Sequence, residues 1–434
     1  MNRIVKNAGW IIGCKVVKAV LVLIVTMITA RYLGVANYGL INYAAGIVAF
    51  VAPIMKLGLD GIAVHEIVNH PDKEGETVGS IIVLCFSSSL LCVLGIFCFS
   101  LVANSDEPIT ISVCVIYGFV LLFQAIEMIQ YWFQAKLLSK YSAIAMLISY
   151  VVVTIVQTLL LLNHVDLRWF ALSYSIDFSV IAIVLLMAYV RISTQKLSFS
   201  INRSKAMLRI SKYYIISGLM TTVFNNTDRI MLKLMVGDAS TGIYAAAHTC
   251  AGMMTFVFIA IIDSMRSTIF ESKKISNDLF EKRIKELYSI VIYFSLFVCI
   301  FVTIFSPNII RVMYGSAYEE SANVLRIAIW FTTFSYMGTT RDIWMLSEGK
   351  QKYIWRISLY GALMNIVLNY GLIPIWGSIG AAIASVISQI FINIIIGFLI
   401  KDLTRSNYLM IAGFKFSTLK GIISKLVGMS IPVQ

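Results

Sequence analysis

Long apolar stretches follow one another along the whole chain, and they constrain its fold more than any other feature. Twelve of them are about 20 residues or longer, at roughly 10–33, 40–64, 78–103, 109–135, 142–163, 167–190, 211–236, 241–268, 287–308, 322–346, 354–375 and 378–400. A helix of about 20 apolar residues spans the ~30 Å hydrocarbon core of a bilayer. Only 13% of the 434 residues are charged, about half the usual share in soluble domains. The sequence predicts an all-α polytopic membrane protein with twelve transmembrane helices.

The loops divide the basic residues unequally between the two sides of the membrane. Of the 35 lysines and arginines, 25 lie on the side that carries both termini, and the other side has only Arg168 and Arg311. The positive-inside rule therefore predicts a multi-pass protein of the cell inner membrane with both termini cytoplasmic. The net charge of +13 then reflects topology and gives no indication of nucleic-acid binding. The first apolar stretch lacks a cleavage site and is expected to remain as the first helix.

Two short patterns recur at similar offsets. "RYLGVANYGLINYAA" at 31–45 resembles "KLMVGDASTGIYAAA" at 233–247, each with two glycines five apart, and "WFQAKLLSKY" at 132–141 resembles "WMLSEGKQKY" at 344–353. Chance recurrence of glycine turns is the alternative. We predict two six-helix bundles in the same orientation, related by a parallel pseudo-two-fold repeat. The predicted parts are a bundle at 1–190, a basic cytoplasmic linker at 191–210, a bundle at 211–400 and an amphipathic cytoplasmic tail at 401–434.

The seven cysteines all lie in apolar segments and include no CxxC pair. We expect them to fill the core, and the sequence predicts no disulfide, no metal site and no cofactor.

The apolar stretch at 211–236 carries an unusually wide polar stripe. At helical spacing, Thr221, Asn225 and Asp228 share one face, and the adjoining face holds Thr222, Asn226, Arg229 and Lys233. Because ionisable groups are costly inside a bilayer, each is a functional hypothesis. The stripe predicts the lining of a wet cavity; a structural pairing of Asp228 and Arg229 with a neighbouring helix is the alternative.

Other ionisable residues interrupt the apolar stretches. Lys15 and Lys18 share a face of the first stretch, where they could also snorkel to the headgroups, and Arg341 lies near the cytoplasmic end of 322–346. A net positive lining attracts an anion, and phosphate above all. The predicted substrate-binding residues are Lys15, Lys18, Asn225, Asn226, Arg229, Lys233 and Arg341. The candidates for coupling to H⁺ or Na⁺ are Glu127, Asp177, Asp228 and Asp263.

Four motifs in chain order, "TARYLGVANYGLINYA", "KLGLDGIAVHEIV", "NNTDRIMLKLMVG" and "TGIYAAA", resemble the Wzx-type polysaccharide flippases of the MOP superfamily. The resemblance implies a MATE-like pair of bundles that opens alternately to the two sides. By this resemblance, the protein would pass undecaprenyl diphosphate-linked oligosaccharide to the outer leaflet for O-antigen or other surface polysaccharide synthesis. An ion gradient would drive this transport.

The same resemblance implies that Lys18, Arg229 and Arg341 face the phosphates, and that a polymerase and a chain-length regulator are possible partners besides membrane lipids. One departure is His65 before Glu66, where the family often has an arginine-glutamate pair.

Two rival functions stay open. A MATE-like exporter of small molecules would share the architecture, but its cavity would be expected to hold more acids than bases. A membrane polymerase or glycosyltransferase of the same pathway would be expected to have a large outer loop, and the predicted outer loops are short. The chain has no GxxxxGK[ST] loop for ATP, and we expect a transporter rather than an enzyme.

Overall fold

The computed structural model describes residues 2–420, and for residues 2–20 and 213 only their helical backbone. Throughout this part of the chain the regular structure is helical, and every predicted apolar segment is mostly helical. The chain forms two compact units, Met1–Gly242 and Ile243–Gln434, called unit 1 and unit 2 below. The predicted contacts of Lys15 and Lys18, and the predicted tail helix beyond residue 420, lie outside the described residues.

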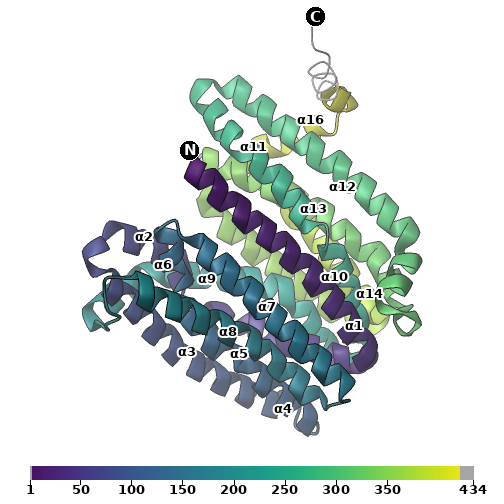
Figure 1. Ribbon diagram of the computed structural model, residues 1–434. Coiled ribbons are helices and arrows are strands. Elements are labelled where there is room, and N and C mark those ends of the chain that lie inside the picture. The colour runs from purple at the N-terminus through teal and green to yellow at the C-terminus, as the bar shows by residue number, and fades with distance from the viewer. Residues whose placement is uncertain (1, 421–434) are drawn as a thin grey trace, which may run out of the picture. The chain divides into compact units, whose positions relative to one another are not determined.

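Unit 1 begins with the long helix α1, which is kinked at Gly34, where φ is 74°. Its helices are α1 (Asn2–Met55), η1 (Leu59–Gly61), α2 (Ala63–Asn69), η2 (Pro71–Lys73), α3 (Glu74–Ala103), α4 (Pro108–Gly118), α5 (Val120–Glu127), α6 (Gln130–Ala135), α7 (Ser139–Leu162), α8 (Leu167–Ile192), α9 (Ile201–Met235) and the start of α10 (Asp238–Gly252). Helix α5 packs between α3 and α8, and α1 contacts α4, α7 and α9 (Figure 1).

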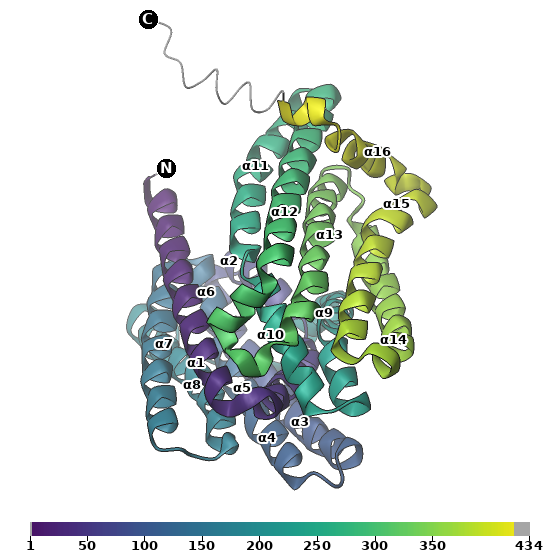
Figure 2. The same ribbon diagram turned by 90° about the vertical axis from the view of Figure 1, so that its right-hand side faces the viewer.

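Unit 2 is built around α12, α13 and α14, which pack side by side in that order (Figure 2). Its helices after α10 are α11 (Thr255–Ile275), α12 (Asn277–Tyr314), η3 (Ser316–Tyr318), α13 (Ser321–Ser347), η4 (Gln351–Tyr353), α14 (Ile354–Ile390), the π-helix η5 (Phe391–Ile395), α15 (Ile396–Leu399), η6 (Lys401–Leu403) and α16 (Thr404–Gly413). Helix α14 has a kink at Gly377.

Eight helical runs in the described residues are long and apolar enough to cross a membrane. Two of these runs, Leu21–Met55 and Gln351–Leu399, each include parts of two predicted segments, because the chain kinks without a loop between them. The remaining two predicted segments lie on α9 and α13. Both helices carry ionisable residues, which lower hydropathy.

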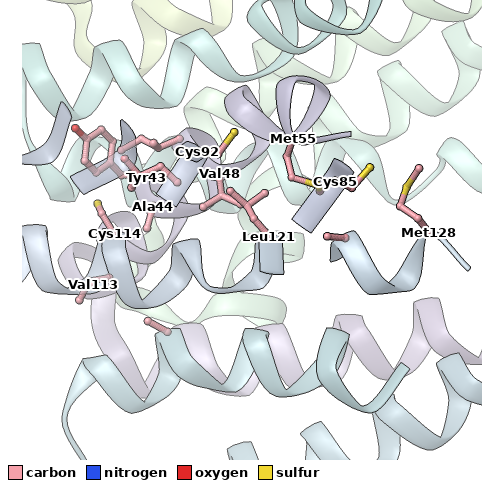
Figure 3. Close-up of a cluster of buried hydrophobic side chains, with 14 of the residues drawn as sticks. Tyr43, Ala44, Val48, Met55, Cys85, Cys92, Val113, Cys114, Leu121 and Met128 are labelled. Carbon is pink, nitrogen blue, oxygen red and sulfur yellow. The ribbon is translucent and has the colours of Figure 1, made fainter. Parts of the chain in front are cut away.

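The core of unit 1 is a continuous layer of apolar side chains between α1, α3, α4 and α5. Met55 from α1 lies next to Cys85 from α3, and Tyr43 from α1 lies next to Cys114 from α4 (Figure 3). Lipid tails are as apolar as these side chains, so close van der Waals packing is what stabilises the layer. Five described cysteines are buried as predicted, whereas Cys98 is exposed.

The segment between α8 and α9 is fixed against the start of α3. Gly75 N–H donates to Gln195 Oε1 (3.0 Å) and its carbonyl accepts from Ser198 N–H (3.2 Å). A Cβ on Gly79 would lie 2.3 Å from the carbonyl oxygen of Ser198, so only glycine admits this approach. The predicted linker at 191–210 is non-helical only between Ile192 and Ile201, and α9 belongs to unit 1.

The recurring tryptophan-to-tyrosine pattern forms the same backbone turn twice. Leu138 N–H donates to Phe133 O at 2.7 Å, and Lys350 N–H donates to Met345 O at 2.7 Å. The residue before each donor is left-handed, with φ of 56° at Leu137 and 67° at Gly349. The local geometry therefore repeats at the offset that the sequence indicated, even though one copy uses leucine where the other uses glycine.

Leu137→Gly should stabilise the protein, because a leucine pays a steric penalty in the left-handed region that glycine avoids. The expected gain is at most about 1 kcal/mol, since glycine also loses more backbone entropy on folding. The thermal midpoint of the purified protein measures it, and Gly349→Leu should lower that midpoint. A lower midpoint for Leu137→Gly would contradict the strain argument.

The two glycine turns are packed directly on each other inside unit 1. A Cβ on Gly39 would lie 1.9 Å from the carbonyl oxygen of Asp238, and one on Gly242 would lie 2.0 Å from that of Val35. The second glycine of each recurring pattern thus lets two helix backbones touch, which larger residues would prevent.

Candidate functional site

The polar stripe of α9 is positioned by α1, which packs along it. Gly46 of α1 lies so close that its Cβ would be 3.6 Å from Cβ of Arg229. Asp228 is 4% exposed, Asn226 and Arg229 are half-buried, and Asn225 is exposed. The predicted stripe therefore faces several environments, with its acid inside the unit and Asn225 at the surface.

Arg229 lies within electrostatic range of Tyr117 on α4. Tyr117 and Tyr174 on α8 pack their rings 4.9 Å apart, and Asp177 on α8 interacts electrostatically with both. We call Tyr117, Tyr174, Asp177 and Arg229 the inner polar cluster. It combines one cation, one acid and two phenols within a membrane-embedded unit, where ionisable groups are rare and mark function.

Asp177 is oriented by a neighbouring helix. Ser149 Oγ on α7 lies 2.6 Å from both the Oδ1 and the backbone carbonyl of Asp177. Sequence reasoning named Asp177 but missed the tyrosines, whose number in the chain, 21, makes single ones uninformative. The signal that could have found them is the helical spacing of Tyr174 and Asp177, which places them on one face.

Lys233, at the end of α9, neutralises two carboxylates. Its Nζ donates to Glu107 Oε2 at 2.6 Å and to Asp238 Oδ2 at 2.9 Å. The lysine is 6% exposed. Because Glu107 precedes α4 and Asp238 begins α10, the two ion pairs link the start of α4 to the glycine turn between α9 and α10. In this arrangement Lys233 stabilises the turn between α9 and α10 through its ion pairs. Its predicted contact with substrate stays a prediction.

Glu107→Gln should remove a pH-dependent contribution to stability. Hydrogen bonds from Lys233 and Thr110 hold the pKa of the Glu107 carboxyl below its usual range, so the ion pair stabilises the fold above about pH 4.3 and is lost as pH falls through the lower folded pKa. The difference in thermal midpoint between wild type and Glu107→Gln should be largest near neutral pH and vanish in acid. The neighbouring variant Asp106→Asn is the control, and an undiminished difference in acid contradicts the assignment.

The other predicted acids lie in different surroundings. Glu127 is 9% exposed, and Gln130 Nε2 donates to it at 3.4 Å. Asp263 is 52% exposed at its side chain and pairs with Arg266 at 3.1 Å. Asp263 therefore has the local partner expected of a surface ion pair, while Glu127 is enclosed.

Arg341 lies inside unit 2 and is 3% exposed. Its Nη1 donates to the carbonyl of Ile392 at 2.7 Å, and its Nη2 donates to Asn393 Oδ1 at 3.0 Å. Both acceptors belong to the π-helix η5, whose wider turn frees backbone carbonyls for outside donors. Arg341 thus holds α13 against an irregular helix, and its predicted phosphate contact stays a prediction.

A fixed positive charge faces Glu66 even though His65 precedes it in the chain. Arg203 at the start of α9 approaches the Glu66 carboxylate at 3.4 Å, and its Nε donates to Thr77 at 3.0 Å. His65 and His70 each lie 3.7 Å from the same carboxylate. The arginine partner is therefore supplied from another helix, which the sequence alone could not indicate.

The fold is that of transporters of the MOP superfamily. One similar structure is an inward-facing multidrug resistance MATE family transporter, with a TM-score of 0.68 and 15% identity, covering 90% of this chain and 95% of that one. Another is the lipid II flippase MurJ in an inward closed conformation, with a TM-score of 0.68 and 14% identity, covering 92% and 89%. At these identities the likeness establishes the fold alone.

The chain belongs to the polysaccharide biosynthesis protein family, whose model matches residues 4–265. It is also similar to the capsular polysaccharide biosynthesis protein CapF of Staphylococcus aureus, with 21% identity over 405 residues, covering 89% of this chain and 96% of the relative. The family resemblance seen in the sequence is thereby confirmed, and the chain is a multi-pass membrane protein of that family.

Proposed function

We propose that this protein is a flippase that moves undecaprenyl diphosphate-linked oligosaccharide units from the cytoplasmic to the periplasmic leaflet of the inner membrane. The observation that carries the proposal is Arg229, a half-buried cation that interacts electrostatically with Tyr117 inside a transporter-fold unit of a polysaccharide biosynthesis family. A guanidinium in a low-dielectric site binds phosphate oxygens through charge-assisted hydrogen bonds.

The physical task fits such a protein. A diphosphate and several sugars cannot cross about 30 Å of hydrocarbon unaided, because each unpaired polar group costs several kcal/mol there. A polar path inside the protein would carry the head while the lipid chain stays in the bilayer. No covalent bond has to be made or broken.

Ion coupling would use the enclosed acids. Asp177 is the first candidate because Ser149 fixes its carboxylate, and the buried Asp228 is the second because it precedes Arg229 on α9. Protonation or Na⁺ binding at an acid in the membrane would change the charge balance around the arginine. Glu127 is the third candidate; the exposed pair of Asp263 and Arg266 supports coupling least.

A MATE-like exporter of small molecules is the second candidate function, favoured by the likeness to a multidrug transporter. Family membership favours the flippase. An exporter of cationic or neutral amphiphiles would also gain nothing from an arginine in its polar lining.

The deciding experiment locates the lipid-linked unit in cells that lack this protein, with a probe confined to the periplasm. The flippase proposal expects the unit to be retained on the cytoplasmic leaflet and released outward when the intact gene is restored. Normal translocation, with unpolymerised units outside, would overturn it and indicate an enzymatic or accessory role.

A further inference from the structure

A compact group of cations from η4, α14 and η6 lies near the start of α14, next to aromatic rings. The carboxylate of Asp402 interacts electrostatically with Lys350, Lys352 and Lys401. Arg356 follows Lys352 by four residues. Counting Asp402, the group has a net charge of +3 from four cations and one acid. We call these five residues the basic rim of unit 2.

The single acid of the basic rim is already satisfied. The Tyr353 hydroxyl donates to the Asp402 carboxylate and, with the three lysines, holds the pKa of that carboxyl below its usual range. Lys350 Nζ donates to the backbone carbonyl of Asp402 at 2.6 Å. Lys352 and Arg356 are exposed and lie over the ring of Tyr353, at 5.2 and 5.7 Å from its centroid. These two cations therefore face outward beside an aromatic platform.

An apolar stripe runs along α14 directly from the basic rim. Residues 356, 360, 363, 367 and 370 follow spacings of four and three, which place them on one helix face. The stripe consists of Tyr360, Leu363, Val367 and Tyr370, which are 47%, 53%, 67% and 73% exposed. The opposite face is packed, since Asn365 and Asn369 are 0% exposed. The stripe is thus an exposed face of a helical run that is long and apolar enough to span a membrane.

The dimensions match one leaflet of a bilayer. Arg356 and Val367 are eleven residues apart, which at 1.5 Å per residue is about 16 Å, or half of the ~30 Å hydrocarbon core. Trp355 and Tyr360 are both exposed near the start of α14, and aromatic rings of this kind collect at membrane interfaces. A lipid whose chain lies on Leu363 and Val367 would bring its headgroup to Lys352 and Arg356.

We propose that the basic rim and the α14 stripe together bind an anionic phospholipid of the leaflet that faces the basic loops. Charge complementarity selects this occupant: two outward cations pair with a phosphodiester, and the net charge of the rim favours an anionic over a zwitterionic headgroup. The open, convex surface of a helix offers no enclosure for a chain of sugars. The site does not depend on the proposed transport function.

The test measures lipid retention by the purified full-length protein in native mass spectrometry. Phosphatidylglycerol and phosphatidylcholine with identical acyl chains are the probes, and Lys352→Gln/Arg356→Gln is the variant. Wild type should retain phosphatidylglycerol preferentially. The variant should bind it about twenty-fivefold more weakly, since each of the two cations near a membrane surface contributes roughly fivefold. Lys274→Gln/Lys282→Gln, which removes two exposed cations from α11 and α12, should behave as wild type.

Three outcomes would overturn the proposal: equal loss of phosphatidylglycerol in both double variants, no preference over phosphatidylcholine, or displacement by undecaprenyl diphosphate at far lower concentration. The last would assign the surface to the lipid-linked substrate. If the variant does not fold, a photoactivatable phosphatidylglycerol on wild-type protein decides. Its crosslinks should concentrate within residues 350–363, and an even spread over the exposed helices contradicts the site.

Discussion

Gly39→Val is expected to abolish folded protein in the membrane. Its Cβ would lie 1.9 Å from the carbonyl oxygen of Asp238 and 2.7 Å from the backbone nitrogen of Gly242. Both obstacles are backbone atoms, so no side-chain rotation relieves the overlap and two helices have to separate. Overpacking of a well-packed core costs about 1–3 kcal/mol, and a backbone collision exceeds that range. The measurement is the yield of monodisperse protein by fluorescence-detected size exclusion.

The control is Gly95→Val on α3, where nothing lies within 4 Å of the added Cβ, and it should give a yield near wild type. Gly242→Val should fail as Gly39→Val does, because its Cβ meets the Val35 carbonyl at 2.0 Å. A normal yield of monodisperse Gly39→Val protein would show that the two helix backbones are not in contact.

The recurring turns could be predicted from the sequence, but not the fact that they touch. Glycine at positions 34, 39, 237 and 242 indicates turns and close packing, whereas the partner of each close approach is a tertiary property. Similarly, hydropathy located the helices, but the kinks at Gly34 and Gly377 join neighbouring segments without a loop. The spacing of apolar residues does not change at such kinks, so it does not reveal them.

The sequence could not indicate the surroundings of the candidate site residues, for a physical reason. Sequence spacing assigns residues to faces of one helix, but the charge that compensates each residue comes from another. Lys233 meets Glu107 from the start of α4, and Arg341 meets carbonyls of η5. Both looked like uncompensated cations in the sequence, whereas the structure engages both within their own units. Arg229, another predicted cation of unit 1, is half-buried and interacts electrostatically with Tyr117 of α4.

Arg229→Ala is expected to abolish surface polysaccharide while leaving the protein in the membrane. A charge-assisted hydrogen bond to a phosphate contributes about 1.5–3 kcal/mol, so losing it would weaken substrate binding roughly ten- to hundredfold. Because each transport cycle begins with substrate binding, we expect this loss to reduce surface polysaccharide to the level of cells that lack the gene. The measurement is polysaccharide on intact cells, normalised to the amount of protein in the membrane fraction.

Two matched variants separate phosphate binding from packing. Arg229→Lys keeps the charge but not the two-pronged donor geometry of a guanidinium, so it should restore part of the polysaccharide, whereas Arg229→Met keeps much of the packing volume and should restore none. Arg266→Ala removes an exposed arginine that pairs with Asp263 and should leave polysaccharide unchanged. Normal polysaccharide from cells with Arg229→Met would show that Arg229 does not bind the substrate phosphates. The proposed cycle would then lack the cation on which the enclosed acids of unit 1 are proposed to act.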